Sequence, residues 1–257
     1  MKKVMFLVYG ILAYLIFFGT FLYAVGFVMS IGVPKGINDP VIFPVKLPWL
    51  LNALLLGAFA IQHSVMARPG FKRWWTKIVP VEIERSTFVL LTCVILIAMF
   101  IFWQPLPVVI WHVQHSVLTG VLTAIGALGF LIVLVSTFII NHFDLFGLRQ
   151  VWLQYVGKPY SHLEFKTRGF YKYMRHPLMF GFLVAFWGTP LMTAGHLVFA
   201  LLTTGYILVA LIFEERDLVT YHGDKYRTYQ REVPKLIPFT KRRIRANTKP
   251  AEESFQF

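Results

Sequence analysis

The sequence predicts an all-α fold: a polytopic transmembrane helical bundle of five to six membrane segments with a C-terminal helical hairpin. The 257 residues are 57% hydrophobic and 14% charged, with a mean hydropathy of +0.63. Soluble domains average about 45–50% apolar and about 25% charged residues. Uninterrupted apolar runs supply the excess, and several reach about the 20 residues that a helix needs to cross a bilayer. The composition therefore excludes a soluble enzyme.

The first four apolar runs each predict one transmembrane helix. The first covers residues 4–29 without a charged residue. At 26 residues it is too long for a signal-peptide core, so we expect it to stay in the mature protein. The next three runs are each ended by a charged or proline-containing loop, and they cover residues 47–66, 87–103 and 117–140.

The last apolar run predicts a tight helical hairpin. Residues 178–213 contain no Asp, Glu, Lys or Arg, but Thr189-Pro190 and Ala194-Gly195 interrupt the run near its middle. Each half then has about 17 residues, the short end of the spanning range. The bundle has six membrane segments if both halves cross the bilayer, and five if the hairpin does not reach the far side.

The basic residues predict the orientation of this bundle. The N-terminus, the loop after the second run, residues 141–175 and the C-terminal tail together hold 23 of the 25 Lys and Arg residues. Since basic loops stay in the cytoplasm, we expect an integral protein of a bacterial inner membrane with both termini cytoplasmic. Orientation in a lipid bilayer accounts for the net charge of +13 without nucleic acid, and no obligate protein partner is inferred. The basic tail at residues 241–245 fits a lipid-headgroup contact or a topology signal.

Polar residues gather where two of the predicted helices end on the cytoplasmic side. His63 lies near the end of the second run, and Asn141, His142 and Asp144 follow the fourth, with Arg149 shortly after. Ionisable residues near membrane depth are costly and indicate function. The alternatives are an interfacial imidazole for His63 and a polar helix cap for Asn141 and Asp144. No metal site is predicted, because no metal-ligand spacing accompanies these residues.

A second polar group surrounds the predicted hairpin. Arg175 and His176 directly precede Pro177, which suits the first turn of a helix. A helix start with free N–H groups beside two basic side chains predicts a site for an anion such as a carboxylate. The hairpin returns Glu214 and Glu215 to the same neighbourhood. A zwitterion with one carboxylate and one ammonium group would meet both signs of charge there.

Residues 162–238 resemble the integral-membrane methyltransferases that include isoprenylcysteine carboxyl methyltransferase and phospholipid N-methyltransferases. The resemblance rests on the ordered pattern T-x-G-x-Y-x-x-x-R-H-P-x-x-x-G at residues 167–181, followed by E-E-x-x-L, G-x-x-Y-x-x-Y and V-P. It implies that S-adenosylmethionine is the zwitterion bound. Met179 stands where that family usually has an aromatic residue. The cofactor-binding residues carried over are Tyr171, Tyr173, Arg175, His176, Gly181, Glu214, Glu215 and Tyr226.

The N-terminal half narrows the resemblance. His63, Ser64, Ala67 and Arg68 are similar to the NnrU-like branch of that superfamily. Residues 141–150 are similar to its thiol-methylating family, whose substrate is a small volatile thiol: methanethiol, which becomes dimethyl sulfide. The resemblance divides the chain into a substrate side at residues 1–150, a cofactor motif with hairpin and cytoplasmic segment at 151–240, and a basic tail at 241–257.

Methylation of a thiol requires a base, since the thiolate is the nucleophile and an alkyl thiol is mostly protonated at neutral pH. By hypothesis His63, His142 and Asp144 form a proton relay that Arg149 steadies. The alternatives are a methyltransferase that acts on prenyl-cysteine or phospholipid, a sterol reductase that uses a nicotinamide, and a non-enzymatic NnrU-like membrane protein.

Overall fold

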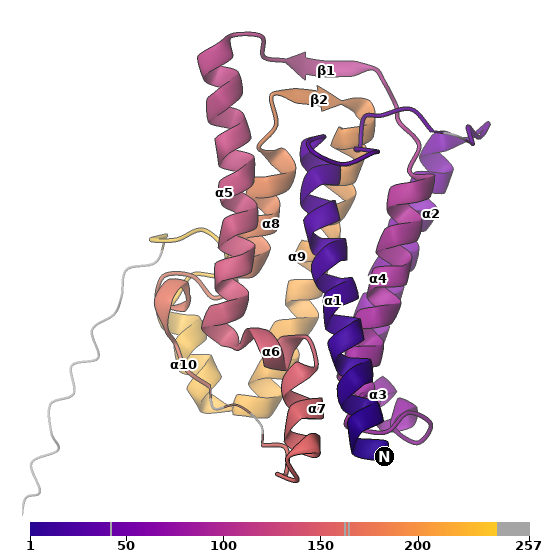
Figure 1. Cartoon of the computed structure of the whole chain (residues 1–257). Helices are drawn as coiled ribbons and strands as arrows, with labels where there is room; N and C mark the ends of the chain where they lie inside the picture. The colour runs from indigo at the N-terminus through magenta and orange to yellow at the C-terminus, as the bar shows by residue number, and fades with distance from the viewer. Residues whose placement is uncertain (42, 162, 164, 241–257) are drawn as a thin grey trace, which may run out of the picture.

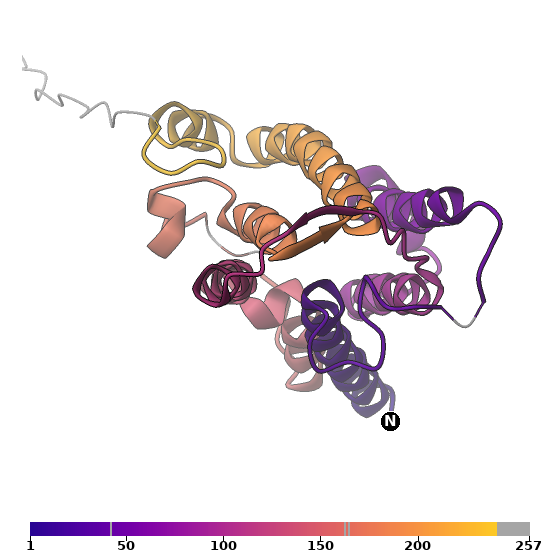
Figure 2. The same ribbon diagram turned by 90° about the horizontal axis from the view of Figure 1, so that it is seen from above.

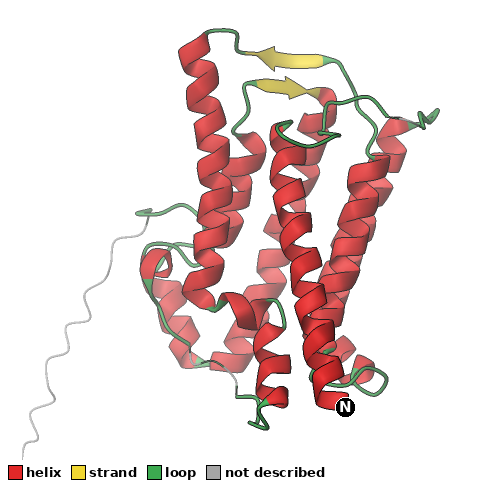
Figure 3. Ribbon diagram, viewed as in Figure 1, coloured by secondary structure: helices red, strands yellow, loops and turns green. Residues whose placement is uncertain are grey.

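The structure, a computed structural model, describes residues 1–41, 43–161, 163 and 165–240. The basic tail expected at residues 241–257 lies outside these. Among the described residues, five helices are long and apolar enough to cross a membrane: α1 (Lys2–Met29), α2 (Pro48–Ala67), α4 (Glu84–Phe102), α5 (Ser116–Ile140) and α9 (Ala194–His222). Figures 1 and 3 show these helices side by side, so the predicted all-α membrane bundle is confirmed.

Shorter elements complete the fold at both ends of the bundle. The helical ones are α3 (Pro69–Trp75), α6 (His142–Leu145), α7 (Leu148–Tyr155), the 3-10 helix η1 (Gly169–Lys172), α8 (Pro177–Trp187) and α10 (Asp224–Glu232). Two short strands, β1 (Val109–His112) and β2 (Leu191–Thr193), pair antiparallel, with Trp111 opposite Met192. This ladder closes the end of the bundle opposite α3, α7 and α10 (Figure 1).

The C-terminal hairpin is present, but its two arms are unequal. α8 has 11 residues and α9 has 29, where two halves of about 17 were expected. At 1.5 Å per residue α8 is about 16 Å long, too short for a hydrocarbon core of about 30 Å. The described part of the chain therefore has five helices of spanning length and one half-length helix. α8 ends at Trp187, with Gly188 as the cap, and β2 follows before α9 begins.

α8 lies against α5 through glycines on both helices. A side-chain carbon at Gly181 would come within 2.7 Å of the Gly129 carbonyl oxygen and 2.9 Å of a Val133 methyl group. Gly188, which caps the end of α8, lies against Gly126 of α5 in the same way. Small residues let helix backbones approach closely in membranes, so these glycines set the position of α8.

Seen from above, the helices are arranged in a ring (Figure 2). Buried aromatic side chains make up half of the largest hydrophobic cluster of the bundle. Trp103 and Phe27 are fully buried there, with Phe199 of α9 at 5.7 Å from the Trp103 ring. The N-terminus, α3, α6, α7 and α10 all lie at the end away from this core (Figure 1). Described parts of all four segments rich in Lys and Arg thus lie at the same end of the bundle. That this end faces the cytoplasm stays a prediction.

Candidate active site

Glu215, near the end of α9, is the centre of an ion cluster. Its Oε1 accepts hydrogen bonds from Arg175, at 2.7 Å from both Nε and Nη2, and lies 3.2 Å from His176 Nε2. Its Oε2 lies 3.2 Å from Lys235 Nζ. The juxtaposition of Glu215 with Arg175 and His176 is the one expected from the hairpin. The sequence did not predict that Lys235 contacts Glu215. Its position directly after the Val233-Pro234 motif could have indicated this contact.

The last turn of α10 and the segment after it hold the Arg175 side chain by hydrogen bonds. The Nη1 group of Arg175 donates to the carbonyl oxygens of Gln230 at 2.9 Å and Val233 at 2.6 Å. The backbone N–H groups of Arg175 and His176 donate to Pro234 and Lys235. These bonds use most of the donors of Arg175, whose side chain is buried. Arg175 therefore connects the start of the hairpin to Glu215 at its end and to the C-terminal segment.

Tyrosines pack around the ion cluster. Tyr226 and Tyr229 of α10 are buried, and the Tyr229 hydroxyl donates to the Tyr171 carbonyl oxygen at 2.6 Å. Burial raises the pKa of Tyr171, Tyr226 and Tyr229, so these phenols remain O–H donors. Tyr173, by contrast, is half exposed and its ring lies 5.5 Å from Phe239. Of the predicted tyrosines, Tyr171 and Tyr226 thus lie at the cluster, whereas Tyr173 lies at its edge.

Two charged side chains at the cluster, Glu214 and Lys235, stay partly exposed and could bind a ligand. The Glu214 carboxylate is 43% exposed and lies 3.8 Å from His176 Nδ1. Lys235 is 40% exposed. An open pocket of 460 Å³ adjoins Lys235, and Glu215, Arg216 and Gln230 are among its other lining residues. Its volume falls within the about 300–1,000 Å³ typical of ligand sites, and it offers both signs of charge to a zwitterion. Gly181, in contrast, lies in the α5–α8 contact described above.

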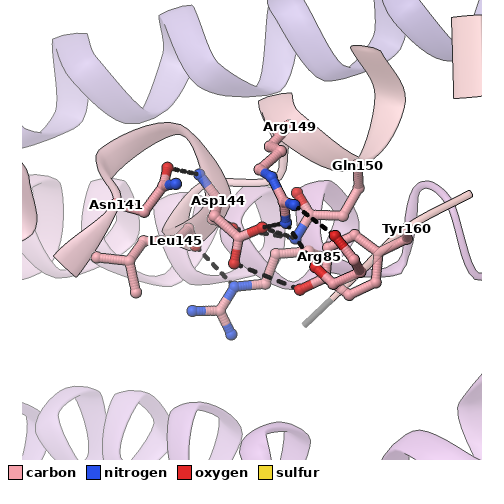
Figure 4. A network of polar contacts seen from close by, with 8 residues as sticks. Arg85, Asn141, Asp144, Leu145, Arg149, Gln150 and Tyr160 are labelled. Atoms are coloured by element: carbon pink, nitrogen blue, oxygen red, sulfur yellow. Dashed lines mark hydrogen bonds and ion pairs between the residues drawn. The ribbon is translucent and has the colours of Figure 1, made fainter. Parts of the chain in front are cut away.

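Asp144 is the centre of a second polar network, shown in Figure 4. Asn141 caps α6 by accepting from the Asp144 backbone N–H at 3.1 Å. The Asp144 carboxylate accepts from Arg149 Nη1 at 2.9 Å and from the Tyr160 hydroxyl at 3.4 Å. Gln150 donates to the Asp144 carbonyl oxygen at 3.1 Å. Arg149 thus pairs with Asp144, and this pair stays partly open to solvent.

Arg85 of α4 reaches the same network from the other side. Its Nε donates to the Leu145 carbonyl oxygen at 2.7 Å, and its charge interacts with Asp144 and with Tyr160. The sequence indicated only a topology role for Arg85, as one of the basic residues of its loop. Its approach to α6 depends on packing between segments that are 60 residues apart.

His63 of α2 lies close enough to Arg85 for the charge of Arg85 to act on its ring. Its ring stacks on Phe59 at 5.3 Å and lies 5.0 Å from the Phe88 ring. Its Nδ1 atom is buried without a hydrogen-bond partner among the described residues. The neighbouring Ser64 hydroxyl bonds to Tyr206 of α9 at 3.3 Å. Tyr206 precedes Glu214 by eight residues, about 12 Å along the helix, so α9 links the His63 region to the ion cluster.

His142 points away from both groups, toward α1. Its Nε2 atom lies 2.9 Å from the Tyr14 hydroxyl and its Nδ1 lies 2.8 Å from Thr137 Oγ1. Since the Thr137 hydroxyl donates to Leu134, Nδ1 is the donor and Nε2 accepts from Tyr14. Among the described residues no contact joins His142 to Asp144 or His63. The structure therefore brings His63, Asp144 and Arg149 around Arg85, but it places His142 outside that group.

Comparison with known proteins places the chain in a family. Residues 50–233 match the family described as a protein of unknown function (DUF1295). A methanethiol S-methyltransferase of Mycobacterium tuberculosis is 52% identical over 242 residues, 94% of this chain and 99% of that protein. A methanethiol S-methyltransferase of Crocosphaera subtropica is 51% identical over 91% of both chains. Nurim of Sus scrofa is 29% identical over 68% of both chains. No solved structure matches the chain at a significant level.

The fold and the two polar groups define a polytopic membrane protein whose ionic centre lies at one end of a helical bundle. The identity of about half of the residues along nearly the whole chain shows the particular family: the chain belongs to the methanethiol S-methyltransferase family.

Proposed function

We propose that this protein methylates methanethiol to dimethyl sulfide with S-adenosylmethionine as the methyl donor. The observation that carries the proposal is the identity of about half of all residues, over more than nine-tenths of the chain, to relatives named for this activity. Prenyl-cysteine, phospholipid and nicotinamide-dependent alternatives have no comparable support. The protein is proposed to lie in a bacterial inner membrane with both termini in the cytoplasm.

The ion cluster of Glu215 is the proposed cofactor site, within the unit at residues 151–240. Arg175, His176 and Glu215 build its rigid base. Glu214 would receive the ammonium group and Lys235 the carboxylate, because both charges are partly uncompensated and Lys235 borders the open pocket. When bound, S-adenosylmethionine supplies a methyl group on a positively charged sulfur, whose transfer to a thiolate gives dimethyl sulfide and S-adenosylhomocysteine.

The network around Asp144, within the unit at residues 1–150, is the proposed substrate side. His63 and Asp144 are proposed to remove the thiol proton, and Arg149 holds the Asp144 carboxylate in place at 2.9 Å. His142 is assigned a positioning role, since both ring nitrogens bond within the fold.

The Asp144→Asn variant tests the substrate side. A general base usually contributes about 10²–10⁴-fold, so we expect a turnover loss of that size with nearly unchanged S-adenosylmethionine affinity. Higher pH should restore part of the loss, because more methanethiol ionises in solution. Headspace detection of dimethyl sulfide and a calorimetric cofactor titration measure the two quantities. Normal turnover at neutral pH would show that Asp144 is only part of a polar cap.

A thermal-shift comparison tests the cofactor. S-adenosylmethionine should raise the Tm of the purified protein, whereas a reduced nicotinamide cofactor should leave it unchanged. A shift with the nicotinamide alone would favour the reductase alternative, and no shift with either would favour a non-enzymatic protein.

A further inference from the structure

We propose that Arg85 is a catalytic residue that holds the substrate sulfur as a thiolate, next to His63. This inference rests on the proposed function, because it names how that same site binds and ionises the thiol.

In the Arg85 side chain, Nε has a hydrogen-bond partner, whereas the two terminal nitrogens have none among the described residues. Its Nε donates to Leu145, and the guanidinium group lies over the Phe88 ring at 5.0 Å. No hydrogen bond or ion pair with any described residue reaches its two terminal nitrogens, which point away from Asp144 in Figure 4. Arg85 is partly buried in the first turn of α4. A guanidinium there loses part of its hydration, so its unpaired donors favour an anionic ligand.

His63 provides an independent sign of a ligand at the same place. Its Nδ1 is buried without a partner among the described residues, although buried polar atoms are normally hydrogen-bonded. The His63 ring and the Arg85 guanidinium both lie about 5.0 Å from the ring of Phe88. A cation and an unpartnered ring nitrogen therefore both lie against the Phe88 ring, and a small thiol with one methyl group could contact both.

The charge around Arg85 also favours an anion. The groups that face it from the neighbouring elements are Lys72 of α3, Glu84 of its own helix, Asp144 of α6 and the Tyr160 phenol, with Arg149 paired to Asp144. Three cations thus meet two carboxylates, which leaves one positive charge to match a thiolate. Burial and the proximity of Arg85 lower the pKa of Lys72, in keeping with this excess of positive charge.

The step assigned to these residues is an ionisation. The S–H bond breaks, the proton passes to His63 Nδ1, and the electron pair stays on the sulfur, facing the Arg85 nitrogens. The proton then leaves His63 through water, and Asp144, on the partly exposed side of Arg85, accepts it before it is released to solvent. Stabilisation of a developing anion by a fixed donor is worth about 10²–10³ in rate.

Arg85→Gln in the full-length protein tests the proposal, with Arg73→Gln as the matched control. Arg73 is an exposed basic residue of α3 at the same end of the bundle. In cofactor-free protein, a calorimetric titration with sodium methanethiolate should show at least about tenfold weaker binding for Arg85→Gln only, in line with a lost charged hydrogen bond. S-adenosylmethionine affinity should be unchanged in both variants. Turnover of Arg85→Gln should fall about 10²–10³-fold.

A series of thiols separates a catalytic role from a structural one. A more acidic thiol needs less stabilisation as its thiolate, so the Arg85→Gln defect should shrink as thiol acidity rises. Arg85→Lys keeps the charge and should recover part of the activity. If Arg85→Gln does not fold, Arg85→Lys still tests whether the positive charge is needed. An equal loss for every thiol, or wild-type methanethiolate binding in Arg85→Gln, would overturn the proposal. A wild-type protein that binds S-adenosylmethionine but methylates no thiol would instead contradict the proposed function itself.

Discussion

At the scale of single residues, two adjacent carboxylates have different surroundings and should have different roles. Glu215 is shared by Arg175, His176 and Lys235, and its removal leaves Arg175 buried without a counter-charge. Breaking such a pair costs about 3–5 kcal/mol. We therefore expect Glu215→Gln to lower the free energy of unfolding by this order, seen as a large drop in Tm.

Glu214→Gln should instead spare stability and impair binding. The Glu214 side chain is half exposed and makes one distant contact, so its loss should change stability by less than about 0.5 kcal/mol. A charged hydrogen bond is worth about 1.5–3 kcal/mol, which predicts roughly 10–100-fold weaker S-adenosylmethionine binding. Unchanged cofactor affinity in Glu214→Gln would remove Glu214 from the site.

His142 predicts a pH dependence of stability. Desolvation lowers the pKa of His142 in the folded protein below its unfolded value of about 6.5. The unfolded chain then binds more protons below this pH, so stability is complete above about pH 6.5 and is lost as the pH falls. The Tm should therefore decrease from pH 7.5 to 5.5, and His142→Asn should decrease less steeply. An equal slope in both proteins would assign the acid sensitivity to other groups.

At the scale of elements, the α5–α8 contact predicts a sharp contrast between two glycines of one helix. A side-chain carbon at Gly129 would collide with the backbone of Ala185, whereas one at Gly120 would meet nothing within 4 Å. Overpacking costs about 1–3 kcal/mol, so Gly129→Ala should lower the Tm and displace α8 with the motif that it carries. Gly120→Ala should be neutral or stabilising, because alanine favours helix. Equal Tm values would contradict this account of the contact.

The elements also show what the sequence could and could not predict. The apolar runs predicted each spanning helix, because length and hydropathy are local properties. The unequal hairpin and the β1–β2 ladder were missed, since they depend on pairing between residues 109–112 and 191–193. Likewise the return of Glu215 to Arg175 followed from the hairpin, whereas the positions of Arg85 and His142 depend on how α4, α6 and α1 pack. A pattern of residue types cannot supply that packing.

At the scale of the whole molecule, one helix joins the two proposed halves of the site. α9 contacts His63's neighbour through Tyr206 and the cofactor motif through Glu214 and Glu215. The basic ends of the other helices gather at the same end of the bundle (Figure 1). The fold therefore places the proposed cofactor site and the proposed thiol site on elements that α9 connects.

Transfer of an isotopically labelled methyl group tests the central claim most directly. The purified full-length protein is incubated with methanethiol and with S-adenosylmethionine whose donor methyl group is deuterated, and the headspace gas is analysed by mass spectrometry. The proposed function predicts dimethyl sulfide that carries one deuterated methyl group, formed in step with S-adenosylhomocysteine and lost in Asp144→Asn. Protein that binds the cofactor but releases no labelled dimethyl sulfide would contradict the account.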